Sequence, residues 1–102
     1  MTSMEKKLTE NRLTEVKAAL SAKYRTVDLG GEKFFVATDG AFFRVGVFPG
    51  AMALVIEYAD TEQEARQNAL EDGDRFYLDE TTLDETTLDE MLRLMIAEIE
   101  RC

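Results

Sequence analysis

The sequence has no histidine, no tryptophan, one proline and a single cysteine, which is the last residue, Cys102. A lone cysteine excludes an intramolecular disulfide. Without histidine the chain cannot build a Ser-His or Cys-His nucleophile or a histidine-based metal site. It also has no P-loop or dinucleotide-binding pattern, because no helix is expected after the glycine pair Gly30-Gly31. We therefore predict that the protein is not an enzyme and binds neither a metal nor a cofactor.

Long apolar runs are missing as well. The longest, from Ala51 to Ile56, is far too short to cross a membrane, and the first residues lack the apolar segment of a secretory signal. We expect a cytoplasmic protein without a membrane partner. Its 102 residues, 45% of them hydrophobic, are enough for one modest core, which predicts a single domain spanning residues 1–102.

Charge is distributed unevenly along the chain. Residues 1–56 carry eight Lys/Arg and six Asp/Glu, a net charge of +2, whereas residues 57–102 carry four Arg and fifteen Asp/Glu, a net charge of −11. The acidic part includes the repeat LDETT-LDETT-LDE, from Leu78 to Glu90. A five-residue period matches neither a helix nor a strand, so we interpret the middle copy as an insertion in a loop. Such a charge field influences partners and association rates rather than the fold.

Apolar spacing predicts three helices. The first lies between Ser3 and Lys23 and has one narrow apolar stripe. The second is short, begins at Asp60 or Thr61 and runs through Leu70. The third is amphipathic and starts at a Thr87/Glu90 capping box, with apolar residues at helical spacing: Leu88, Met91, Leu92, Met95, Ile96 and Ile99.

Turn residues between β-rich runs predict an antiparallel meander of four strands, at residues 25–29, 33–38, 41–48 and 51–58, with a brief fifth strand at 75–78. Asp39-Gly40 is typical of a two-residue hairpin turn. Such a turn pairs Val36 with Phe43 and gives an apolar core face of Phe34, Val36, Phe43, Val45 and Val47. The opposite face then carries Phe35, Ala37, Phe42, Arg44, Gly46 and Phe48. Three phenylalanines around one arginine form an unusual exposed face, so we expect a helix or a partner to cover it.

The segment Glu71-Asp72-Gly73-Asp74 allows three interpretations. With Asp79 and Glu80 it is rich in oxygen ligands, but the spacing that a calcium loop needs is missing. It can also be a solvated helix stop with Gly73 as the residue after the cap. Finally, it can be an acidic surface for a basic partner. In that case Asp72 and Asp74 would anchor the partner on a tight turn, and the repeat residues Asp84 and Glu85 would add steering.

Part of this chain resembles small bacterial immunity proteins of polymorphic-toxin and contact-dependent-inhibition systems. The resemblance lies in Glu57-Tyr58-Ala59, Glu64-Ala65, Glu71-Asp72-Gly73-Asp74 and Leu78, about a fifth of the sequence. It implies a cytoplasmic α+β protein that binds and blocks a cognate toxin. The family has no shared catalytic residues, and the LDETT duplication departs from its pattern.

We therefore expect an α+β domain that inhibits a cationic, nuclease-like toxin and does not itself bind nucleic acid. The predicted partner-binding residues are Asp72, Asp74, Asp79, Glu80, Asp84 and Glu85. One alternative is a homodimeric structural or regulatory module that uses the Phe-rich face, with Phe35, Phe42, Arg44 and Phe48 as its interface. Another is an anti-defence protein that mimics DNA, which needs carboxylates spaced like phosphates.

Overall fold

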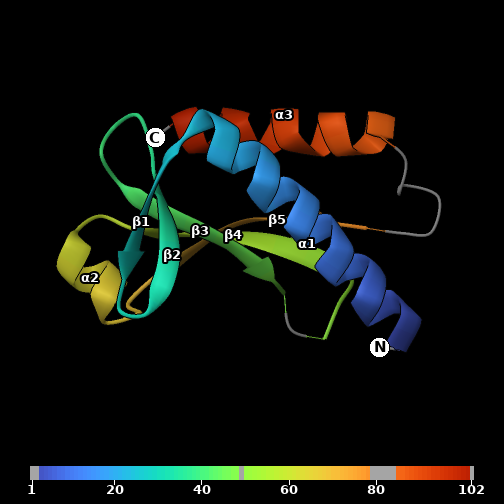
Figure 1. Cartoon of the computed structure of the whole chain (residues 1–102), viewed down its shortest axis with the longest axis horizontal. Coiled ribbons are helices and arrows are strands. Elements are labelled where there is room, and N and C mark those ends of the chain that lie inside the picture. The colour runs from blue at the N-terminus through green and yellow to red at the C-terminus, as the bar shows by residue number, and fades with distance from the viewer. Residues whose placement is uncertain (1–2, 49, 79–84, 102) are drawn as a thin grey trace.

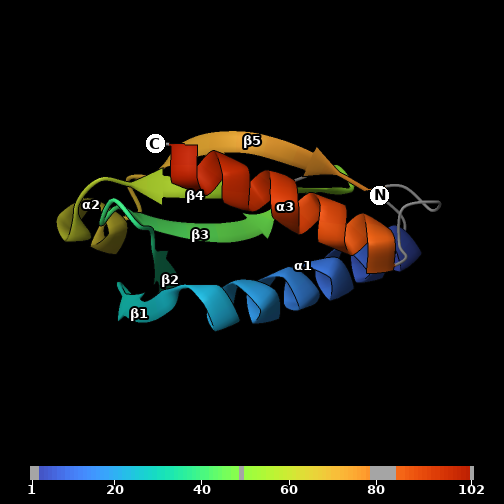
Figure 2. The ribbon, with the colours of Figure 1, turned by 90° about the horizontal axis from the view of Figure 1, so that it is seen from above.

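The computed structural model describes residues 3–48, 50–78 and 85–101. Two long helices lie side by side over one face of a five-stranded antiparallel sheet, and a short helix packs at one end (Figure 1, Figure 2). In chain order the elements are α1 (Ser3–Lys23), β1 (Arg25–Leu29), β2 (Glu32–Val36), β3 (Phe42–Val47), β4 (Ala53–Ala59), α2 (Glu62–Arg66), β5 (Glu71–Tyr77) and α3 (Glu85–Arg101). The strands follow one another across the sheet in sequence order. This confirms the predicted α+β fold.

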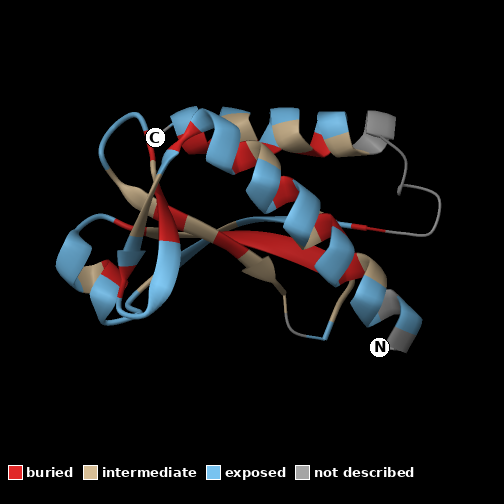
Figure 3. Ribbon diagram, in the orientation of Figure 1, coloured by how far each residue is buried: buried red, intermediate tan, exposed pale blue. Residues whose placement is uncertain are grey.

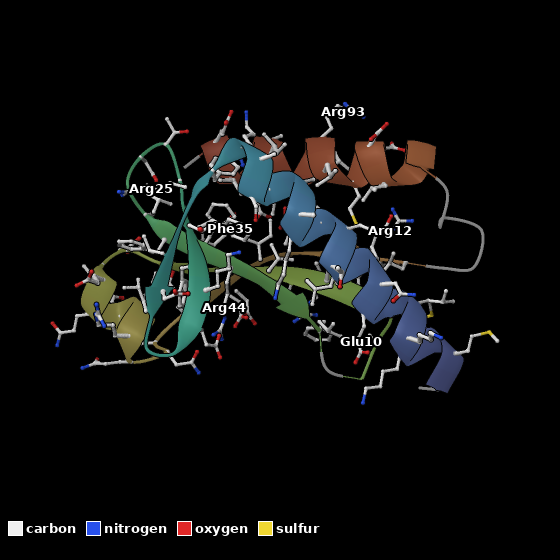
Figure 4. All side chains as sticks on the ribbon, viewed as in Figure 1. Glu10, Arg12, Arg25, Phe35, Arg44 and Arg93 are labelled. Atoms are coloured by element: carbon white, nitrogen blue, oxygen red, sulfur yellow. The ribbon has the colours of Figure 1, made fainter. Side chains whose placement is uncertain are left out.

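Helix α1 buries the side that faces the sheet and α3. Its buried residues recur at the three- and four-residue spacing of one helix face: Thr9, Arg12, Val16 and Leu20. Two of the four are polar, which explains why the apolar stripe looked so narrow in the sequence. Arg12 is only 1% exposed and lies on the α3 side of α1 (Figure 4).

The hairpin between β2 and β3 differs from the predicted one. Ala37 N–H donates to the Ala41 carbonyl, and Gly40 N–H donates to the Ala37 carbonyl, so the loop has three residues, Thr38-Asp39-Gly40. Gly40 takes a φ of 91°, as the last residue of such a loop requires. The Asp39 carboxylate accepts from Ala41 N–H and holds the turn.

The extra loop residue moves the register by one, and a one-residue shift exchanges the two faces of a strand. Phe35, not Val36, therefore lies opposite Phe43. The rings of Phe35 and Phe43 stack with centroids 5.2 Å apart in the main core beneath α1 and α3. Phe34 is buried on the other face. The predicted grouping of Phe34 with Phe43, and of Phe35 with Phe42, is wrong.

The second core, on the opposite face, is small and is closed by α2. It comprises Leu29, Phe34, Ala59 and Ala65, with Val27, Phe42 and Leu70 packed around it. Thr61 caps α2 by accepting from Glu64 N–H, as predicted. The helix stops at Arg66, before the predicted Leu70, and Asn68 follows with a φ of 57°. Gly30 in the β1–β2 turn lies so close to α2 that a Cβ atom would come 2.6 Å from the Arg66 carbonyl oxygen.

The predicted stripe of helix α3 is confirmed. Its residues Met91, Met95 and Ile99 belong to the main core, and Leu88, Leu92 and Ile96 pack against it. The helix begins at Glu85, two residues before the predicted cap at Thr87. Buried residues follow its inner side and exposed residues its outer side (Figure 3). Arg93 points away from the sheet (Figure 4).

Candidate protein-binding surface along β5 and α3

The segment around Gly73 is neither a turn nor a helix stop but part of the edge strand β5. Among the described residues, β5 has one sheet neighbour, β4. Leu78 N–H donates to the Met52 carbonyl, and the same register pairs Phe76 with Leu54. Hydrogen-bonded and non-bonded pairs alternate in an antiparallel ladder. The backbone groups of Arg75 and Tyr77 therefore point away from β4, toward the outer edge.

A buried carboxylate joins β5 to α3. Glu98 is 6% exposed, and its two oxygens accept from the Tyr58 hydroxyl and from Asp74 N–H, the latter at 2.7 Å. Burial raises the pKa of Glu98, and the neighbouring Asp74 carboxylate raises it further, while the hydrogen bonds from the Tyr58 hydroxyl and from Asp74 N–H lower it. The joint fixes the separation between the edge strand and the helix.

Gly73 makes this joint possible. The register of β5 against β4 shifts between Val55 and Glu57, so Gly73 and Asp74 together lie opposite Ile56 as a β-bulge. A Cβ atom on Gly73 would come within 2.6 Å of both Glu98 Oε2 and Tyr58 Cε2. Only glycine leaves room for the carboxylate and the tyrosine ring at this point.

A groove runs between the outer edge of β5 and the exposed side of α3. It has a volume of about 730 Å³, with residues 72–77 on one side and Leu94, Ala97, Glu98 and Arg101 on the other. On the α3 side of the groove Leu94 is apolar and 48% exposed, and on the β5 side the backbone of Tyr77 forms the rim, its 63% exposed side chain lying on the sheet face away from α3. We call this surface, formed by residues 72–77 with Leu94, Ala97, Glu98 and Arg101, the β5–α3 groove.

Acidic groups surround this groove, but the two predicted anchor residues, Asp72 and Asp74, do not lie on the same side of β5. Asp72 is exposed and lies opposite Glu57 on the sheet face away from α3. The Asp74 side chain instead lies on the α3 side, 3.7 Å from the Arg101 guanidinium. The expectation that a Gly73 turn holds both carboxylates together is therefore wrong, because the bulge turns them to opposite sides of β5.

The side chains of the other four predicted partner-binding residues are not described. Asp79, Glu80 and Asp84 lie outside the described residues, and Glu85 is the first residue of α3, where only the backbone is described. Their part in binding stays a prediction.

The alternative interface predicted on the sheet does not exist as one surface. Phe35 is 2% exposed in the main core, under the helices (Figure 4). Phe42 packs against the α2 core. Arg44 forms ion pairs with Glu32 and with Glu57, its Nε lying 3.2 Å from Glu57 Oε1. Arg75 covers the Phe48 ring at 4.0 Å. On the sheet face with Phe42, Arg44 and Phe48, where cover by a helix or a partner was expected, paired charges and a stacked arginine provide much of the cover.

Sequence reasoning missed Glu98, Tyr58, Tyr77 and Leu94. Glu98 did carry a signal, because it follows Met91 by seven residues and Met95 by three and so falls inside the apolar stripe of α3. A charged residue inside such a stripe indicates a buried, partnered group. Leu94 carried the complementary signal, an apolar residue outside the stripe.

Within residues 3–48, 50–78 and 85–101, no group of three or more acidic or thiol side chains could hold a metal ion. None of the described helices is long and apolar enough to cross a membrane. Comparison with models of known protein families, with curated proteins and with solved structures gave no match.

Proposed function

We propose that this protein is an immunity-type inhibitor that captures a cationic, nuclease-like toxin through the β5–α3 groove. The observation that supports this most directly is the combination of the exposed apolar Leu94 and the open edge of β5 with a rim of carboxylates. Interfaces commonly have an apolar or aromatic centre and a polar rim. The net charge of −11 on residues 57–102 complements the cationic surface that a nuclease needs to hold phosphates.

A homodimer is the weaker explanation for this groove. Two copies would each bring a net charge of −9, with their acidic segments facing each other. The Phe-rich interface suggested for a homodimer also requires Phe35 at the surface, whereas this ring is buried.

The test is inhibition of a defined toxin. The gene next to the one for this chain supplies the first candidate, and its product is expressed with and without this protein and assayed for nucleic-acid cleavage. We expect a one-to-one complex, loss of cleavage and protected growth. Leu94→Ser should weaken the complex at least tenfold, whereas Met4→Ser, at the even more exposed Met4 of α1, should not. Full cleavage in the presence of excess inhibitor, for a cationic toxin from that position, would contradict the proposal.

A further inference from the structure

We propose that the partner reaches the groove as an extended, basic segment that adds to the sheet as a sixth strand beside β5. This inference rests on the proposed function and specifies the form in which the partner binds. The first observation is the backbone of β5. Arg75 and Tyr77 direct their N–H and C=O groups outward, on the side without a strand neighbour among the described residues. Unpaired edge groups of this kind are the template for strand addition.

The protection of this edge is concentrated at one end. Natural edges are blocked by proline, by charged side chains, by a bulge or by a covering element, and the carboxylates of β5 lie at residues 71–74. In β5 the bulge lies at Gly73–Asp74, and Glu98 already accepts from Asp74 N–H. The Arg75 side chain turns to the opposite face and stacks on Phe48. Within residues 3–48, 50–78 and 85–101, the edge of the three residues Arg75 to Tyr77 has no strand neighbour, and the bulge marks the end of the docking site.

The side chains around this edge indicate the composition of the added strand. Successive side chains of a strand point to opposite faces. Those on the α3 side would enter the groove and contact Leu94, Ala97 and Met91, which favours apolar residues there. Those on the other side would pass the Tyr77 ring and the Arg75 side chain that stacks on Phe48. Carboxylates lie at the two ends of the open stretch, with Asp72 beyond Arg75 and Glu90 on α3, which favours lysine or arginine there. The expected segment therefore combines apolar residues facing α3 with basic residues.

Charge also argues against a second copy of this chain as the added strand. Pairing of two β5 edges would bring together two acidic segments, because residues 57–102 of each copy carry a net charge of −11. Like charges brought together at an interface cost free energy. A basic segment from another protein meets the same edge with complementary charge.

The probe is the peptide acetyl-Lys-Val-Lys-Val-Lys-Val-Lys-amide, and its control is the fully N-methylated peptide. The control keeps the charge and the side chains but has no backbone donor. We expect the unmodified peptide to bind at least tenfold more tightly. We also expect it to slow amide hydrogen exchange at Arg75 and Tyr77. By the ladder alternation from the Gly30-Gly31 turn, Asp28 N–H faces outward on the other edge strand, β1, and its exchange should not change.

The protein side is tested with Tyr77→Pro and Tyr77→Ala. Proline removes an outward N–H that β4 does not use, so the edge strand tolerates it. We expect Tyr77→Pro to lose about as much peptide affinity as N-methylation does, and Tyr77→Ala to lose clearly less. If Tyr77→Pro does not fold, the peptide pair alone decides.

Two results would overturn strand addition. If both peptides bind equally, with strong salt dependence and no change in exchange at Arg75 and Tyr77, the acidic surface attracts cations without pairing its backbone, and the proposed function survives. If neither peptide binds, strand addition is wrong whatever the toxin assay shows. Failure of the toxin assay alone leaves the peptide result intact, so the two proposals are judged separately.

Discussion

Strands β1 and β5 form the two edges of the same sheet, but they are attached to it in different ways. In β1, Leu29 is 3% exposed and belongs to the α2 core, and both α1 and α2 contact the strand. In β5 no residue is buried, and its ties to the helical layer are the half-buried Phe76 and the polar contacts of Asp74 with Glu98 and Arg101. A buried side chain and two helices hold β1, whereas pairing with β4, one half-buried ring and a few polar contacts hold β5 beside an open groove. An edge attached in this second way keeps its backbone available to a partner.

The largest expected difference concerns stability. Leu29→Ala removes a fully packed side chain and should lower the free energy of unfolding by about 2–5 kcal/mol. Tyr77→Ala removes a larger but 63% exposed side chain and should change it by no more than about 0.5 kcal/mol. Urea denaturation of both variants measures the difference. Equal losses would mean that β5 is as much a part of the core as β1.

The next prediction tests the joint between β5 and α3. Gly73→Ala forces a Cβ atom against Glu98 and Tyr58 and should destabilise the protein by about 1–3 kcal/mol. Gly46→Ala is the matched control, because its Cβ atom would have one neighbour at an ordinary 3.7 Å, Glu57 Oε1. Thermal unfolding of the two variants gives the answer. A stable Gly73→Ala protein with unchanged exchange at Asp74 N–H would show that the bulge is not tightly packed.

The pH dependence of Glu98 provides a smaller effect with a definite sign. Because burial raises its pKa in the folded protein, the folded state favours the protonated form. This contribution to stability is fully present below the usual glutamate pKa, and it is lost as the pH rises through the raised pKa. Glu98→Gln cannot lose a proton, so the stability of the wild type relative to this variant should fall across that pH interval. Denaturation of both proteins at several pH values gives the difference between their free energies of unfolding. A difference that does not change with pH would contradict a raised pKa for Glu98.

These contrasts also explain what the sequence could and could not predict. Element order, the meander and the α3 stripe follow from local periodicity and turn residues, and all three were predicted. The β2–β3 register was not, because Asp39-Gly40 fits both a two-residue turn and the end of a three-residue loop. The choice depends on whether Phe34 or Phe35 fills the main core, which is a tertiary property.

The site was predicted less well than the fold, for a related reason. Charge density identified the acidic half, but Asp72-Gly73-Asp74 looks like a turn in any local pattern. Its place in β5 depends on pairing with β4 and on the room that Gly73 leaves for Glu98 and Tyr58. Those contacts join residues distant in the sequence, so no local motif encodes them.

The central claim is that the β5–α3 groove captures a cationic partner, and carboxylate-to-amide substitutions test it with almost no change of structure. Asp72→Asn with Asp74→Asn removes two charges from β5, and Asp28→Asn with Glu10→Gln removes two exposed charges from the N-terminal half. Neither pair should alter folding by more than about 0.5 kcal/mol. The measurement is the association rate with the candidate toxin at low and at physiological salt.

If the β5–α3 groove captures a cationic partner, association should slow steeply with salt. The β5 pair should slow association severalfold at low salt, whereas the control pair should leave it nearly unchanged. Because Asp74 lies at the groove itself, the β5 pair should also speed dissociation. Equal effects of the two pairs, or association that ignores salt, would contradict the claim that this edge of the sheet is the binding surface.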